Sequence, residues 1–226
     1  MPTISPADAR NGGLLLYLAL AYALYAASGA IPSRDRPGRR APARVLADKG
    51  AFALVFAILP LGVFALLGAR LPGLEYLYAG DPRAWAMPAA ALALVAYAAG
   101  RLGPMDKADL ANYPQYLPAR WGPGELLAEG LSWLLYLSAY EFVFRGMLLS
   151  VLMPAGALAA AAASTALYAF AHLPKGNKEA LGCLVFGVAA SALTLRFGSV
   201  LPAALVHAAL ALGNDRNAFV RLSGGS

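Results

Sequence analysis

Four side chains capable of acid–base or ion-pair chemistry lie in or beside long apolar stretches of the sequence. Glu141 and Arg145 occur in the run Tyr140-Glu-Phe-Val-Phe-Arg-Gly146, and the only two histidines of the chain are His172 and His207. A spacing of four residues places Glu141 and Arg145 on one face of a helix, where their charges can partly neutralise each other. An ionisable group in a transmembrane helix is costly unless it is paired, so these residues are candidates for a functional site.

A carboxylate with two imidazoles supports two kinds of hydrolytic chemistry. Glu141 can act as a general base on water while His172 and His207 stabilise the developing oxyanion. Alternatively, Glu141, His172 and His207 can hold a divalent metal such as zinc, with one position left for water. Glu141 and Arg145 also fit a purely structural ion pair. Glu179, which follows the turn after His172, offers a further carboxylate and equally fits an acidic residue in the first turn of a helix.

The composition excludes a water-soluble enzyme. Of 226 residues, 60% are hydrophobic and 13% are charged, about half the ~25% charged share of soluble domains. The single cysteine, Cys183, excludes an intramolecular disulfide and a CxxC motif. The net charge of +6 comes from basic residues between apolar runs. This pattern favours contact with the lipid bilayer and excludes nucleic acid as the expected partner.

Seven apolar stretches approach the roughly 20 residues needed to cross a bilayer. We therefore predict an all-α, polytopic transmembrane helix bundle of about seven spans, at residues 13–30, 51–69, 84–100, 128–152, 155–173, 179–195 and 200–213. The connection 101–124 contains four prolines, which prevent one continuous helix. We expect it to lie along the cytoplasmic interface, either as a structured linker or as the edge of a substrate entrance.

The basic residues predict the topology. Segment 34–49 holds six of them, so we place it in the cytoplasm, and alternation from there places 13 of the 18 basic residues on that side. The N-terminus is then outside and the C-terminus inside. The short loops and the composition rich in alanine and arginine are typical of bacterial proteins. The expected location is therefore the bacterial inner membrane, with a multi-pass topology.

Three short motifs follow one another on successive predicted helices. They are Glu141-Phe-Val-Phe-Arg145-Gly146, Tyr168-x-x-x-His172, and Gly198-Ser-Val-Leu-Pro followed by His207. Together they resemble the CPBP family, the CAAX protease and bacteriocin-processing family of intramembrane endopeptidases. The resemblance covers roughly residues 133–215. It implies an all-helical bundle with a catalytic cavity reached from the cytoplasm, so we divide the chain into N-terminal helices with an amphipathic linker (1–123) and a catalytic helical core (124–226).

The chain departs from the family's motifs in two places. The resemblance implies Glu-Glu-x-x-x-Arg, with the leading glutamate activating water, but Tyr140 stands at that position. It also implies His-x-x-x-Asn, but Ala211 stands where the asparagine would be. Asn214 follows Ala211 by about one turn and lies roughly on the His207 face. We therefore count Asn214 and Glu179 among the candidate site residues, Glu179 as a source of the missing carboxylate.

The favoured hypothesis is an intramembrane endopeptidase that hydrolyses a peptide bond of a membrane-associated protein or peptide. In it Glu141 is the base and Arg145 orients Glu141, while His172 and His207 stabilise the oxyanion or bind the metal. The alternative is a catalytically degenerate family member that acts as a membrane scaffold or immunity-type binding protein. A small transporter is less favoured, because the sequence lacks the repeated halves typical of transporters.

Overall fold

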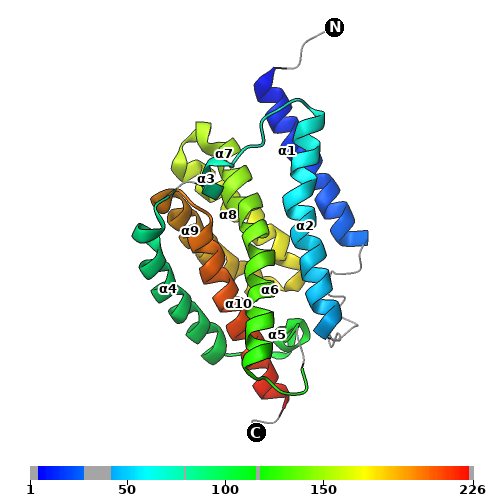
Figure 1. Ribbon diagram of the computed structural model, residues 1–226, viewed down its shortest axis with the longest axis vertical. Helices are drawn as coiled ribbons and strands as arrows, with labels where there is room; N and C mark the ends of the chain where they lie inside the picture. Colours follow the sequence, from blue (N-terminus) through cyan, green and yellow to red (C-terminus); the bar gives the residue numbers. More distant parts are fainter. Residues whose placement is uncertain (1–4, 28–41, 79, 116–117, 224–226) are drawn as a thin grey trace.

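The computed structural model describes residues 5–27, 42–78, 80–115 and 118–223. Every regular element in these ranges is a helix (Figure 1), which confirms the all-α prediction. The elements are α1 (Pro6–Ala27), α2 (Pro42–Leu66), α3 (Glu75–Tyr78), α4 (Pro82–Leu102), α5 (Lys107–Asn112), α6 (Pro123–Glu141), the π-helix η1 (Phe142–Leu148), α7 (Leu149–Leu152), the 3-10 helix η2 (Met153–Ala155), α8 (Ala157–His172), the 3-10 helix η3 (Leu173–Lys175), α9 (Asn177–Phe197) and α10 (Leu201–Leu222).

Five helical stretches among the described residues are long and apolar enough to cross a membrane. They are Val45–Leu66, Pro82–Leu102, Pro123–Ala155, Ala157–Lys175 and Asn177–Phe197. The prediction of a polytopic helix bundle is confirmed, whereas the count of about seven spans is not reproduced. Helices α1 and α10 form over the first and last predicted spans, but α10 runs nine residues past Gly213 through the polar Asn214–Asn217. Residues 28–30 of the first predicted span lie outside the described residues.

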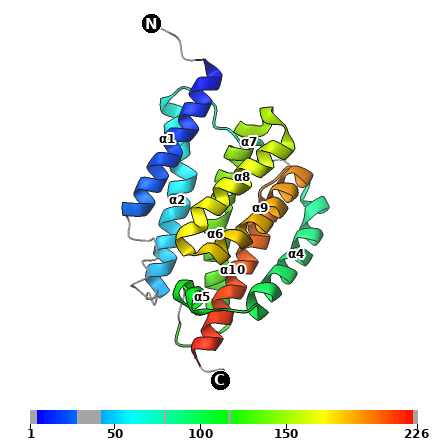
Figure 2. The same ribbon diagram turned by 180° about the vertical axis from the view of Figure 1, so that it is seen from behind.

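The bundle places α1 and α2 on one side and α4 on the other, with α6, α8, α9 and α10 between them (Figures 1 and 2). Helix α2 packs along α6, α4 along α10, and α8 along α9. Helices before and after residue 123 therefore pack in one bundle. The division of the chain into residues 1–123 and 124–226 stays a prediction. Helix α1 begins near one end of the long axis and α10 ends near the other (Figure 1).

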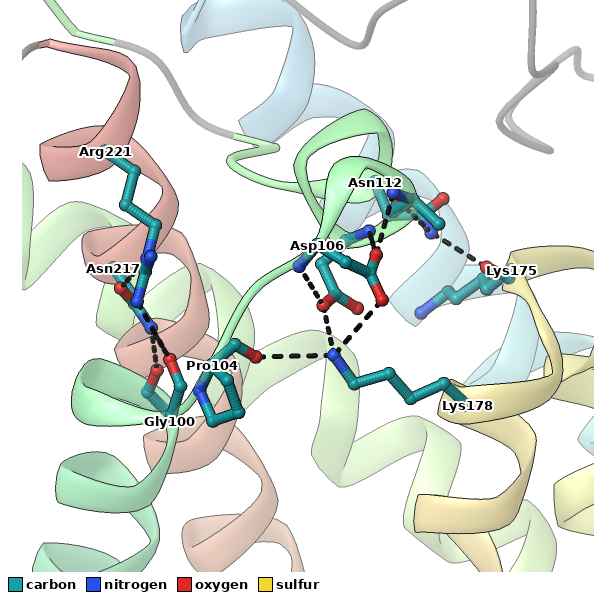
Figure 3. A network of polar contacts seen from close by, with 11 residues as sticks. Gly100, Pro104, Asp106, Asn112, Lys175, Lys178, Asn217 and Arg221 are labelled. Atoms are coloured by element: carbon teal, nitrogen blue, oxygen red, sulfur yellow. Dashed lines mark hydrogen bonds and ion pairs between the residues drawn. The ribbon is translucent and has the colours of Figure 1, made fainter.

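Glycines bring α4 and α10 into direct backbone contact. A Cβ atom at Gly213 would collide with the carbonyl oxygen of Tyr97, and one at Gly100 with that of Leu210. Below this contact, the Asn217 Nδ2 donates to the carbonyl oxygens of Gly100 and Gly103 at 2.9 and 2.8 Å (Figure 3). Close glycine packing of this kind is common between membrane helices, because it lets backbones approach.

The connection after α4 is fastened to the turn that precedes α9. Its short helix α5 begins at Asp106, whose carboxylate accepts from the backbone N–H groups of Asp109 and Ala108. Those bonds, led by the one from Asp109, hold the pKa of Asp106 below its usual value, with help from Lys178. Lys178 pairs with Asp106 and Asp109, and the Asn112 Nδ2 donates to the carbonyl of Lys175 at 2.9 Å (Figure 3).

The basic segment 34–49 requires one correction. Residues 34–41 lie outside the described residues, and the remainder belongs to α2. Lys49, which the sequence analysis places in a cytoplasmic connection, is buried and forms an ion pair with Glu129 of α6. The predicted span begins at Ala51, where the apolar run starts after Lys49, whereas helix α2 begins at Pro42.

We predict that Gly213→Ala lowers the free energy of unfolding by about 1–3 kcal/mol, because the added methyl group forces α10 away from α4. The control is Gly182→Ala on α9, where a Cβ atom would meet nothing within 4 Å. There the better helix propensity of alanine should leave stability unchanged or raise it by up to about 1 kcal/mol. Thermal unfolding of both variants in detergent checks this, and equal shifts would contradict the close contact.

Candidate active site

The helix that carries Glu141 changes geometry at the first motif. Helix α6 ends at Glu141 and continues directly into the π-helix η1, which contains Arg145 and Gly146. Such wider turns inside α-helices are rare and are frequently found at functional sites. Gly73, which has a φ of 82°, lies against the backbone of Gly146, and a Cβ atom at Gly73 would overlap it. The absence of a side chain at Gly73 therefore allows the loop before α3 to pack on this turn.

The third motif forms the turn that starts α10. Gly198 ends α9 in the left-handed conformation with a φ of 64°, as is usual for glycine after a helix. Pro202 occupies the first turn of α10, where its missing N–H is tolerated. The backbone N–H of Val200 donates to the carbonyl of Tyr76 at 3.0 Å, which fixes the turn to α3. This turn sets the direction of α10 and hence the position of His207.

The Glu141 carboxylate lies between Arg145 and His207. Its Oε1 is 2.6 Å from His207 Nδ1, and its Oε2 is 2.8 Å from Arg145 Nη1. The side chains of Glu141 and Arg145 are fully buried, whereas that of His207 is 12% exposed. The contact with Arg145 is an ion pair by distance, but the N–H groups of the guanidinium are not directed along it and make no hydrogen bond. The guanidinium instead stacks 4.2 Å from the Tyr168 ring centre.

Hydrogen bonds select the same tautomer for both neutral imidazoles. His207 Nδ1 donates to the Glu141 carboxylate, and His172 Nδ1 donates to the backbone carbonyl of Tyr168 at 2.9 Å. Because a carboxylate and a carbonyl can only accept, the proton of each neutral ring is on Nδ1 and its Nε2 carries a lone pair. The Tyr168 hydroxyl lies 3.3 Å from His207 Nε2, and its ring centre lies 4.6 Å from that of His172. Tyr168 thus connects the two histidines.

Tyr140 packs beside both imidazole rings. Its ring centre is 6.1 Å from that of His172 and 6.4 Å from that of His207, with edge-to-face geometry in both cases. It also packs against Phe144 at 4.8 Å. The position at which the family motif has its leading glutamate is therefore in this group of side chains, and an aromatic ring fills it.

Two other predicted residues lie elsewhere. Glu179 accepts from the Tyr113 hydroxyl at 3.0 Å and pairs with Lys175 at 3.3 Å, so it interacts with His172 only electrostatically. Asn214 lies against Gly100 of α4, because it is about 10 Å further along α10 than His207. In the described part of the chain no hydrogen bond joins Asn214 to His207. The structure thus brings together Glu141, Arg145, His207 and, through Tyr168, His172.

A two-histidine, one-glutamate metal site does not fit this arrangement. Across residues 5–27, 42–78, 80–115 and 118–223, no group of three or more His, Cys, Asp or Glu side chains is placed to hold a metal ion. Both oxygens of Glu141 face other partners, one Arg145 and the other His207. The chemistry available to these residues is acid–base chemistry by the two Nε2 atoms, each in a ring held by its Nδ1 bond.

The bundle contains a second buried group of ionisable residues that is not among the predicted site residues. Lys49, Glu129 and Asp215, here called the Lys49 cluster, come from α2, α6 and α10, and Trp133 packs among them. All three are buried, Glu129 and Asp215 completely. A signal was present, because Glu129 is the second residue of the fourth predicted span and Asp215 lies two residues after the last one.

We predict that Arg145→Met lowers the free energy of unfolding by about 3–5 kcal/mol, because it leaves the Glu141 charge buried without its guanidinium. The double variant Glu141→Gln/Arg145→Met removes both charges and should recover much of this loss. Thermal unfolding of the wild type, the two single variants and the double variant completes the cycle. Additive losses would mean that the two side chains do not interact.

Comparison with known proteins agrees with the motifs. Residues 124–213 match the family model described as Type II CAAX prenyl endopeptidase Rce1-like. The match starts at the second residue of α6, ends within α10, and includes Glu141, Arg145, His172 and His207. No curated protein and no solved structure matches the chain. Residues 124–213 therefore match the Type II CAAX prenyl endopeptidase Rce1-like family, in agreement with the CAAX protease families that the motifs resemble.

Proposed function

We propose that this chain is an intramembrane endopeptidase that hydrolyses a peptide bond of a membrane-associated protein or peptide. The family of residues 124–213 supports an intramembrane protease fold. The observation that supports catalysis most directly is the 2.6 Å bond between the buried Glu141 carboxylate and His207 Nδ1. A carboxylate in this position holds an imidazole in one tautomer and stabilises the imidazolium, as in hydrolase triads.

In this mechanism His207, rather than Glu141, takes the proton from water. The Glu141 side chain is fully buried with an oxygen toward each neighbour, whereas the His207 side chain is partly exposed. Water attacks the peptide carbonyl as its proton passes to His207 Nε2, and the imidazolium then gives that proton to the leaving amine. Arg145 offsets the cost of burying the Glu141 charge.

Two groups near His207 are available to the oxyanion of the tetrahedral intermediate. The Tyr168 hydroxyl is a neutral donor 3.3 Å from His207 Nε2. His172 can donate from Nε2 only when it is protonated, because its Nδ1 proton already goes to a backbone carbonyl. Tyr140 stands where the family has a glutamate and contributes an aromatic wall that limits the access of water to the two imidazoles.

We expect His207→Gln and Glu141→Gln to lower the rate of peptide cleavage by about 10²–10⁴, the usual contribution of a general base. Glu75→Gln is the matched control, because Glu75 is exposed and bonded to Ser150 on another part of the bundle. New protein N-termini can be quantified by mass spectrometry in membranes that contain each variant at equal abundance.

The same measurement separates the mechanisms. Loss of cleavage in Glu179→Gln with full activity in Glu141→Gln would move the essential carboxylate to α9 and refute the mechanism. If the wild type cleaves nothing and Glu141→Gln keeps the cellular phenotype, the scaffold or immunity-type alternative replaces the protease. That alternative draws support from Tyr140 and Ala211, which replace two of the family's polar residues.

We also propose that the protein is a multi-pass protein of a bacterial inner membrane with its C-terminus in the cytoplasm. The distribution of the basic residues supports this orientation. A fluorescent protein fused after Ser226 should fluoresce, and alkaline phosphatase fused at the same place should be inactive. The reverse result for both reporters would contradict the orientation.

A further inference from the structure

The Lys49 cluster joins three helices by polar contacts. The Lys49 ammonium pairs with Glu129 and lies 3.5 Å from the centre of the Trp133 ring. The Trp133 indole N–H donates to Asp215 Oδ2 at 2.8 Å, so Asp215 lies beside the ring that the Lys49 ammonium contacts. Ser132 donates to Glu129 Oε2 at 3.0 Å. Helices α2, α6 and α10 therefore meet through buried charged groups, of which Glu129 and Asp215 are completely buried.

The charges of the cluster balance only if it holds one extra proton. Lys49 supplies one positive charge, and Glu129 and Asp215 would supply two negative charges if both were ionised. When two completely buried carboxyl groups lie in one cluster with a single ammonium group, the second ionisation is opposed by the first negative charge and by burial, so one carboxyl group tends to keep its proton. Burial raises the pKa of Asp215 to about 8, with Lys49 opposing the rise.

Among the described residues, the charges that act most strongly on Asp215 are those of Lys49 and Glu129. The connection before α6 contributes the backbone N–H of Gln115, which donates to Asp215 Oδ1 at 2.9 Å, and Tyr113, whose hydroxyl donates to Glu179. Arg216, next to Asp215 on α10, lies over the ring of Trp121. Lys49 comes from α2 and Glu129 from α6.

The cluster and the Glu141–His207 bond are two connections between the same pair of helices. Trp133 bonds to Asp215 from the middle of α6, and Glu141 bonds to His207 from its end. Between them, Trp133 and Leu137 of α6 pack against Ala208 and Ala211 of α10 in one apolar group. Glu129 and Glu141 are about 18 Å apart along the helix. A change at the cluster therefore acts on the register in which α6 presents Glu141 to His207.

We propose that Glu129 and Asp215 share one proton and that this protonated Lys49 cluster positions Glu141 against His207. Loss of the proton leaves an unbalanced negative charge between α2, α6 and α10, which loosens their junction. The effect on cleavage rests on the function proposed above. The effect on stability does not.

The sign of the pH dependence follows from linkage. A carboxyl whose pKa is higher in the folded protein than in the unfolded chain stabilises the fold most below its ordinary pKa, here 3.8. That stabilisation is lost as the pH rises toward and through the raised value. Between pH 6 and pH 9 the melting temperature of the wild type should fall by roughly 5–10 °C more than that of a variant without the proton.

The experiment measures melting temperature against pH for the purified full chain in detergent. Asp215→Asn should remove the excess fall, because the amide does not ionise, although its single oxygen can accept from only one of the two N–H groups of Trp133 and Gln115. Glu129→Gln should also remove it, because Lys49 and Asp215 then balance with no proton. Asp106→Asn is the control and should keep the wild-type slope, since Asp106 is exposed with a lowered pKa and is ionised throughout this range.

The outcomes separate this proposal from the protease proposal. If either cluster variant folds and keeps the full wild-type slope, or if the wild type shows no excess fall over Asp215→Asn, the shared proton is refuted. If the slope behaves as expected but cleavage is equally sensitive to pH in the wild type and in Asp215→Asn, the positioning role is refuted. If no cleavage occurs at any pH, the protease proposal fails, and the melting curves still decide the shared proton.

Discussion

The charge of Glu141, buried without solvent, is the constraint on which the rest of the site depends. An isolated carboxylate in an apolar helix bundle is far too costly to persist, so its neighbours must compensate it. Arg145 does so from the next turn of the same helix, and His207 does so from α10. Three features hold this arrangement in place. They are the π-helix η1, the packing of Gly73 against Gly146, and the stacking of Arg145 on Tyr168.

Much of the site could be predicted from residue types and spacing, because polar groups in apolar helices have few partners available. A spacing of four residues on a helix places Glu141 beside Arg145. The order of the motifs along the chain indicates which helices carry the two histidines. The tautomers and the Glu141–His207 bond could not be predicted, since they depend on how α10 is rotated against α6. Asn214 shows the limit of helical periodicity. Asn214 lies on the same face of α10 as His207, but two turns after His207 this face packs against α4.

The all-α fold followed directly from composition, whereas the limits of the spans did not. Hydropathy detects where a run of apolar residues begins, and Lys49 lies two residues before such a run. In the folded chain it belongs to α2 and faces Glu129. Charges that neutralise each other across helices look, in the sequence, like the ends of spans. Glu129 and Asp215 are far from Lys49 in the sequence, so no local pattern could have shown that the three belong together.

The separation of the Lys49 cluster along the chain also has a consequence for biosynthesis. Lys49 precedes Glu129 by 80 residues, and Trp133 precedes Asp215 by 82. At about 5–20 residues per second, each of these intervals takes roughly 4–16 s of translation. Lys49 must therefore wait near the headgroups, where its long side chain can reach water, until α6 and then α10 arrive. The last helix to leave the ribosome completes the cluster, so a chain that stops short of Asp215 would leave the indole N–H of Trp133 in α6 without its hydrogen-bond partner.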